Sequence, residues 1–163
     1  MIRGGSFAIA GAALLLAVPA LAVDPPVETY EIDDAAVFKA AGFKLATDAW
    51  HGCGDPGTAG YLPGQIEQVA DLNGDGFPEA IITESSSFCF GATEVGYTLL
   101  SSDPSGEWRV LGSGPGFVTV LATRGTNDWP DLQVGGPGFC HQVLRWDGAA
   151  YTLNRKEYEG KAC

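Results

Sequence analysis

The chain has few basic residues. Its 163 residues include 9 Lys and Arg against 20 Asp and Glu, which gives a formal net charge of −11 at pH 7. A surface of this sign repels the phosphates of nucleic acids and of anionic membranes. The acidic residues are spread along the sequence rather than blocked in one tail, so much of the excess serves solubility. We therefore exclude nucleic acid as a partner and expect a protein or a polysaccharide whose identity the sequence does not give.

Only one long apolar run is present, and it lies near the start. Residues 7–18 are apolar throughout, and residues 20–22, Ala-Leu-Ala, have the small-x-small form of a signal-peptidase site. Twelve residues are too few to span a bilayer, which takes about 20. We expect residues 1–22 to be a cleaved signal peptide and residues 23–163 to be a single domain, periplasmic or secreted, without a membrane span.

The sequence also lacks the common catalytic signatures. No Gly-x-Ser-x-Gly elbow is present, and the glycine-rich segment 135–138 has no lysine or following helix to hold a phosphate. A hydrolase would have to draw its catalytic groups from His51, His141 or Glu84. An inhibitor of a secreted enzyme would instead present a disulfide-stapled loop such as 51–64. Both stay open as alternatives to a non-catalytic module.

Glycine and proline, by contrast, are plentiful, with 23 and 10 copies that punctuate short apolar runs. This spacing predicts an all-β fold, mainly an antiparallel meander in two small sheets or propeller-blade-like units. One short helix is expected near the N-terminus at 35–41, capped by Asp33 or Asp34 and stopped by Gly42. Strands are expected at 43–50, 65–71, 79–84, 96–101, 107–111, 117–122, 132–134, 141–146 and 151–155, with loops at 84–95 and 112–116.

Four cysteines follow the leader. An even number in an exported chain favours disulfides, and four cysteines allow three pairings. The predicted meander places Cys53 and Cys89 at the same end of one sheet, and a hairpin at 141–158 brings Cys140 close to Cys163. We therefore expect Cys53–Cys89 and Cys140–Cys163. Free thiols would instead favour a zinc or copper site, since each histidine lies near a cysteine.

The segment 71–79 carries the clearest chemistry. It reads Asp-Leu-Asn-Gly-Asp-Gly-Phe-Pro-Glu, with oxygen-bearing side chains at Asp71, Asn73 and Asp75 and a turn-forming Gly76. Calcium takes six to eight oxygen ligands, and short loops supply them with this spacing. An EF-hand is excluded because it needs a glutamate at the twelfth position, which here is Ile82, and helices on both sides. The alternative is an ordinary Asx-rich turn without a metal.

These residues resemble the calcium hairpin loop of FG-GAP and VCBS repeat proteins, Asp-x-(Asp/Asn)-x-Asp-Gly-x-x-(Asp/Glu). The resemblance implies a Ca²⁺ site in which the side chains of Asp71, Asn73, Asp75 and Glu79 and the backbone carbonyl of Phe77 are ligands. It also implies blade-like β-units. A propeller needs at least four blades, and this chain has room for two or three. We therefore expect a small open or two-sheet domain.

A weak internal repeat is present at an offset of 52 residues. Segment 76–82 aligns with 128–134, each reading aromatic, proline, acid and then a short apolar strand. In the second copy Thr123, Gly125 and Asn127 replace the three oxygen-bearing residues of the loop. The sequence therefore predicts one calcium site in a duplicated β-unit and, for the whole chain, an exported calcium-binding domain with a non-catalytic binding or envelope-structural role.

Overall fold

The computed structural model describes residues 29–163, and the predicted signal peptide lies outside this part of the chain. The described residues form two antiparallel sheets and a few short helices, which confirms the all-β prediction. Within residues 29–163 no helix is long and apolar enough to cross a membrane.

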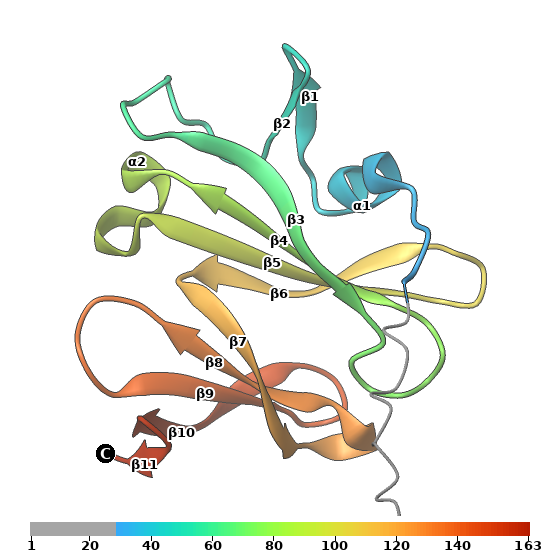
Figure 1. The fold of residues 1–163 in the computed structure, drawn as a ribbon, viewed down its shortest axis with the longest axis vertical. Coiled ribbons are helices and arrows are strands. Elements are labelled where there is room, and N and C mark those ends of the chain that lie inside the picture. Colours follow the sequence, from blue (N-terminus) through green and yellow to red (C-terminus); the bar gives the residue numbers. More distant parts are fainter. Residues whose placement is uncertain (1–28) are drawn as a thin grey trace, which may run out of the picture.

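The first sheet contains six strands in the order β1-β2-β3-β4-β5-β6, and each pairs antiparallel with its neighbour in the chain (Figure 1). Because every connection joins adjacent antiparallel strands, the sheet is a simple meander. Its strands are β1 (Lys44–Ala46), β2 (Ala49–His51), β3 (Leu62–Ala70), β4 (Glu79–Ser85), β5 (Val95–Ser102) and β6 (Trp108–Pro115).

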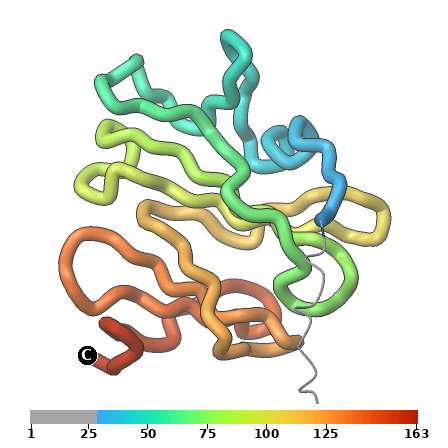
Figure 2. Tube along the Cα trace, viewed as in Figure 1, coloured from blue at the N-terminus to red at the C-terminus, as the bar shows by residue number. Residues whose placement is uncertain are grey.

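The second sheet is a meander of the same kind, in the order β7-β8-β9-β10-β11. Its strands are β7 (Phe117–Arg124), β8 (Pro130–Gly135), β9 (His141–Trp146), β10 (Tyr151–Tyr158) and β11 (Lys161–Ala162). Gly116 alone separates β6 from β7, so the chain passes directly from the edge of one sheet to the edge of the other (Figure 2).

The predicted helix forms one residue earlier than expected, as α1 (Asp34–Ala40). Its N-cap is Asp33, whose Oδ1 accepts hydrogen bonds from the backbone N–H groups of Ala35 and Ala36 at 2.9 and 3.3 Å. Val37 and Phe38 are its buried residues. The aspartate cap and these two apolar residues therefore fix where the helix begins and which face it packs against the sheet.

Alternate residues of β4 and β5 face two different apolar clusters. Ala80, Ile82 and Leu100 pack with α1, whereas Ile81 and Leu99 pack with residues of the second sheet. This follows from the two-residue period of a strand. The two central strands are thus covered on both faces, by the helix on one side and by the second sheet on the other.

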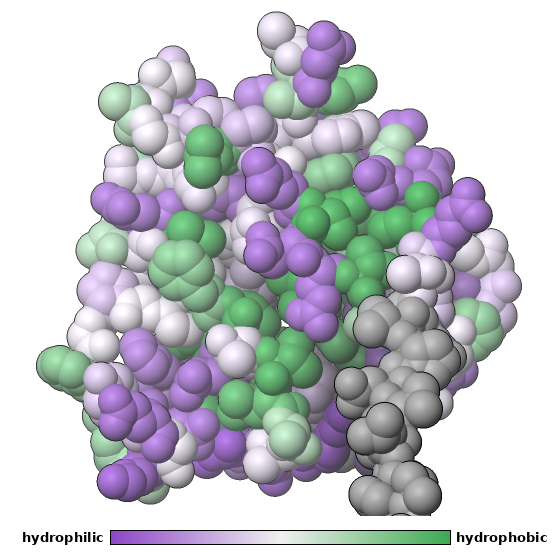
Figure 3. Space-filling model, in the orientation of Figure 1, coloured by the Kyte–Doolittle hydropathy of each residue, from purple (hydrophilic) through white to green (hydrophobic). Residues whose placement is uncertain are grey.

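Hydrophobic residues also gather across the middle of the face shown in Figure 3, interrupted by hydrophilic ones.

Some predicted boundaries were wrong. The single strand expected at 43–50 is a hairpin, β1 and β2, in which Thr47 and Asp48 form the turn with φ of 48° and 61°. The loop expected at 112–116 is largely the continuation of β6, and the loop expected at 84–95 contains α2 (Ser87–Phe90) and the 3₁₀ turn η1 (Gly91–Thr93). A second 3₁₀ turn, η2 (Thr126–Asp128), connects β7 to β8.

Two disulfides tie the sheets at their ends. Cys53 is bonded to Cys89 and Cys140 to Cys163, the pairing expected from the meander. The first joins the segment before β3 to α2, and the second joins the β8–β9 connection to the end of the chain. Since neither pair leaves a thiol free, the alternative His/Cys metal site is excluded.

Candidate functional site

The loop between β3 and β4 is folded around the side chain of Asp71. The Asp71 carboxylate accepts hydrogen bonds from the backbone N–H groups of Gly74 at 2.7 Å, Asp75 at 3.2 Å and Gly76 at 2.8 Å. Gly76 has φ of +90°, a conformation that favours glycine. The sharp turn expected at this position is therefore present, and an aspartate lies at its centre.

Asn73 and Asp75 complete the loop through further hydrogen bonds. The Asn73 Oδ1 atom accepts from the Asp75 backbone N–H at 2.9 Å, and Asn73 Nδ2 donates to Asp75 Oδ2 at 2.9 Å. The backbone N–H of Phe77 donates to Asp75 Oδ1 at 2.9 Å. Each of these oxygens retains a lone pair, because a carboxylate or amide oxygen can accept two hydrogen bonds.

Glu79 lies at the base of the loop, as the first residue of β4, and is 1% exposed. Its Oε2 atom accepts a hydrogen bond from the backbone N–H of Leu72 at 2.8 Å. Among residues 29–163, its Oε1 atom is the one buried side-chain oxygen or nitrogen with no hydrogen-bond partner. An unsatisfied buried carboxylate oxygen is costly, so this atom marks where a partner is missing.

Burial raises the pKa of Glu79 to about 7. The Leu72 N–H opposes this rise, as does the nearby Ser101 hydroxyl, which itself donates its hydrogen bond to the Ser102 carbonyl at 3.2 Å. The negative charges of Asp75 and Asp71 add to the rise. Burial is the largest cause, because it disfavours the charged carboxylate. The contributions of Asp75 and Asp71 show that both lie close enough to act on Glu79.

The predicted ligands all belong to this one loop, but their side chains do not converge. Within residues 29–163 no group of three or more His, Cys, Asp or Glu is arranged to hold a metal ion. The reason is visible in the hydrogen bonds, because the aspartates are turned toward the backbone N–H groups of their own loop. A cation would require these side chains to turn toward Glu79.

Comparisons with protein-family models, with curated proteins and with solved structures find no match to this chain.

The second sheet contains a comparable buried acid, Asp131, near the start of β8. Asp131 is fully buried and accepts hydrogen bonds from Arg145 Nε at 2.8 Å, Arg155 Nη1 at 2.7 Å and the Thr123 hydroxyl at 2.6 Å. These contacts, with Arg145 as the largest, hold the pKa of Asp131 well below its usual value although burial opposes them. Here the protein supplies the positive charge that Glu79 lacks.

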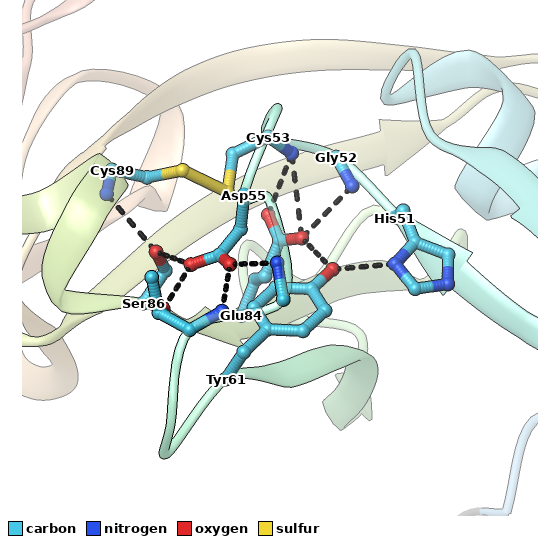
Figure 4. Close-up of a disulfide and its surroundings, with 10 residues drawn as sticks. His51, Gly52, Cys53, Asp55, Tyr61, Glu84, Ser86 and Cys89 are labelled. Atoms are coloured by element: carbon cyan, nitrogen blue, oxygen red, sulfur yellow. Dashed lines mark hydrogen bonds between the residues drawn. A yellow bond between two sulfur atoms is a disulfide. The ribbon is translucent and has the colours of Figure 1, made fainter.

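A second polar network lies at the opposite end of β4, beside the Cys53–Cys89 disulfide (Figure 4). The carboxylate of Glu84, 4% exposed, accepts hydrogen bonds from the backbone N–H groups of Gly52 and Cys53, each at 3.0 Å. The Tyr61 hydroxyl donates to Glu84 at 2.7 Å and lies 2.7 Å from Nδ1 of His51. Glu84 thus anchors the 52–61 segment to the sheet.

Asp55 extends this network toward α2. It accepts hydrogen bonds from the hydroxyls of Ser86 at 2.5 Å and Thr58 at 2.7 Å. Partial desolvation would raise the pKa of Asp55, but these hydroxyls and the backbone N–H groups of Thr58 and Gly57 lower it to about 2. The sequence analysis did not identify Asp55, Tyr61 and Ser86 as parts of one network, because the network joins segments that lie far apart in the chain.

The candidate catalytic residues do not form a catalytic group. His51 and Glu84 share Tyr61 as a hydrogen-bond partner and have no direct hydrogen bond. His141 lies in β9 of the other sheet, where its ring centroid is 6.1 Å from that of Tyr158. Among residues 29–163, no two of His51, Glu84 and His141 are therefore hydrogen-bonded to each other, so the hydrolase alternative lacks a paired acid and base.

Proposed function

We propose that this chain is an exported calcium-binding β-domain that acts as a non-catalytic binding or envelope-structural module. The observation that carries the proposal is Glu79, a buried carboxylate with one oxygen unpartnered, at the base of a loop rich in carboxylate and amide oxygens. The buried oxygen argues against an ordinary Asx-rich turn, because such a turn needs no glutamate buried beneath it.

The chemistry of the residues present suits a calcium ion, although their side chains would have to turn toward Glu79 to bind it. The side chains of Asp71, Asn73, Asp75 and Glu79 and the carbonyl of Phe77 are oxygen donors only, which suits a hard cation. Three of them are carboxylates, and the charges of two, Asp75 and Asp71, add to the rise that burial causes in the pKa of Glu79. When bound, the ion would neutralise this charge and give the orphaned Oε1 atom of Glu79 a partner.

The loop is well placed to act on the whole domain. It joins β3 to β4, and Leu72 within it packs in the cluster between the two sheets, together with Ile81, Leu99 and Leu132. The guanidinium of Arg124, at the end of β7, donates a hydrogen bond to the Leu72 carbonyl. A loop held by an ion would therefore support the contact between the sheets as well as the hairpin.

Two features support the predicted duplication of a β-unit. Each sheet contains a four-stranded antiparallel meander, β3 to β6 and β7 to β10, and in each a cysteine stands between the second and third strands. The disulfides and the predicted signal peptide favour export to the periplasm or beyond. The partner would be a protein or polysaccharide.

Thermal unfolding tests the proposal. Extracellular calcium modules bind with dissociation constants of about 10⁻⁴–10⁻³ M, so 10 mM calcium should stabilise the protein by about 1.5–2.5 kcal/mol relative to chelator. Asp75→Ala should abolish this difference. Asp147→Ala is the matched control, because Asp147 also accepts two backbone N–H groups in an exposed turn but has no carboxylate partners nearby. Equal melting temperatures of the wild type in calcium and chelator would contradict the proposal.

A further inference from the structure

A cavity of about 340 Å³ lies on the helix side of the first sheet, at the opposite end of β4 from the calcium loop. Its wall includes Glu84 and both cysteines of the Cys53–Cys89 disulfide. Small-molecule sites are typically cavities of this size, lined by apolar and aromatic groups with a few polar ones that fix orientation.

Two phenyl rings lie close over glycine backbone in this cavity. The ring of Phe90 lies so close to Gly96 that a β-carbon there would be 2.2 Å from it, and a β-carbon on Gly52 would be 2.5 Å from the ring of Phe43. Gly96 is the cross-strand partner of Glu84, and the Gly52 N–H donates to the Glu84 carboxylate. Both rings therefore lie over glycines that pair with or donate to Glu84, and both line the same cavity as Glu84.

Glu84 has no cationic partner. Among residues 29–163, the acidic partners in ion pairs are Asp131 and Glu157 only. Every hydrogen bond that Glu84 accepts comes from a neutral backbone N–H or from the Tyr61 hydroxyl. A carboxylate 4% exposed without a counter-ion is unusual, since buried charges are generally paired. The Oε1 atom of Glu84 accepts three hydrogen bonds, whereas Oε2 accepts one, from the Cys53 N–H, and so retains a lone pair for a ligand.

We propose that this cavity binds a small organic monocation, an ammonium group carried on an apolar body. The ammonium group would pair with Glu84, and the apolar body would contact Phe43, Phe90 and Ile82. Aromatic faces attract cations, and an ion pair removed from water gains strength. The excess of negative charge on the chain favours the approach of such a ligand.

Ser113 offers a way to block the cavity without disturbing Glu84. It lines the cavity from β6 and is exposed, so a large side chain there would fill the opening at little cost to the fold. Thr119, an exposed residue of β7 in the second sheet, is the matched position for the same substitution outside the cavity.

The experiment titrates the disulfide-bonded protein, in saturating calcium, with phenethylamine and with its neutral counterpart phenethyl alcohol, followed by backbone amide NMR shifts. We expect phenethylamine to shift the amides of Cys53 and Gly96 and to bind at least tenfold more tightly than the alcohol. Ser113→Tyr should weaken amine binding at least tenfold, and Thr119→Tyr should leave it unchanged. Glu84→Gln should remove the preference for the amine over the alcohol.

Because Glu84 also anchors the 52–61 segment, Glu84→Gln is interpreted only if its amide spectrum outside this segment matches that of the wild type. Ser113→Tyr tests the site independently of that condition. The proposal is overturned if amine and alcohol bind equally well, if Ser113→Tyr binds the amine like the wild type, or if no amide at the cavity shifts at 10 mM amine. None of these outcomes bears on the calcium loop, which lies at the other end of β4.

Discussion

Glu79 and Asp131 are both buried acids near the start of the second strand of a four-stranded meander, but only Asp131 is paired with arginines. They also align in the predicted repeat. In the second sheet Arg145 and Arg155 supply positive charge to Asp131, whereas in the first sheet Glu79 has one backbone N–H and one oxygen without a partner. We propose that the two arginines supply the positive charge in the second sheet, and that a bound cation supplies it in the first.

The first prediction concerns the pH dependence of stability without calcium. The pKa of Glu79 is raised by burial from 4.5 to about 7, so between these values the unfolded chain releases a proton that the folded chain retains. The free energy of unfolding therefore falls by about 3 kcal/mol as pH rises from about 4.5 to 7, because the carboxyl ionises in the unfolded chain while it stays protonated in the folded one. Urea unfolding in chelator should show this loss in the wild type relative to Glu79→Gln. A difference between the two proteins that does not change with pH would contradict it.

The second prediction concerns Asp131 and has the opposite sign. Its pKa is lowered by Arg145, so its contribution to stability is present above the unfolded value of 3.8 and is lost as pH falls through the folded value. Asp131→Asn should destabilise the protein by about 2–3 kcal/mol at pH 7, less than for a fully buried pair because both arginines are partly exposed. In urea unfolding this difference should shrink below pH 4. Asp147→Asn, at an exposed turn, should change stability by less than about 1 kcal/mol.

A third prediction concerns Arg124. Its guanidinium donates to the carbonyls of Leu72 and Asp128 and so links the 71–79 loop to the second sheet. Arg124→Met keeps the length of the side chain but removes both hydrogen bonds, and it should cost about 1.5–3 kcal/mol in urea unfolding. If Arg124→Met leaves stability unchanged, the loop is not coupled to the second sheet through this contact.

The two disulfides should differ in importance. The loops closed by Cys53–Cys89 and Cys140–Cys163 span 36 and 23 residues, which corresponds to about 4 and 3.5 kcal/mol of stabilisation by chain entropy. The first also holds in place the backbone N–H groups of Gly52 and Cys53, which donate hydrogen bonds to the Glu84 carboxylate. Replacing Cys53 and Cys89 by serine should therefore lower the free energy of unfolding by more than replacing Cys140 and Cys163. The gap between the two losses should exceed the small difference in chain entropy. Equal losses for the two serine variants would contradict this.

The fold could be predicted from the sequence because its signals are local. Glycine and proline separate short apolar runs, and the alternation in β4 directs Ile81 and Ile82 to opposite faces. The hairpin at 44–51 was missed because its turn residues, Thr47 and Asp48, adopt positive φ without the glycine or asparagine that usually signals such a turn. The pairing of β1 with β2 depends on both strands, and neither three-residue strand signals it alone.

The candidate site could be predicted only in part, for the same reason. The spacing of Asp71, Asn73 and Asp75 identified the loop, since all its residues are consecutive. The burial of Glu79 and the absence of a partner for its Oε1 atom depend on the second sheet, which the spacing does not reveal. The network of Glu84, Tyr61 and Asp55 likewise joins segments more than 20 residues apart and has no sequence signature.

Calorimetric titration of calcium into the metal-free protein tests the central claim most directly, with Glu79→Gln as the matched variant because it keeps the size and the Leu72 contact of the side chain. We predict one calcium ion per chain for the wild type, with a dissociation constant of about 10⁻⁴–10⁻³ M, and at least tenfold weaker binding for the variant. Absence of heat of binding in the wild type at millimolar calcium, or equal affinity of the two proteins, would contradict the account.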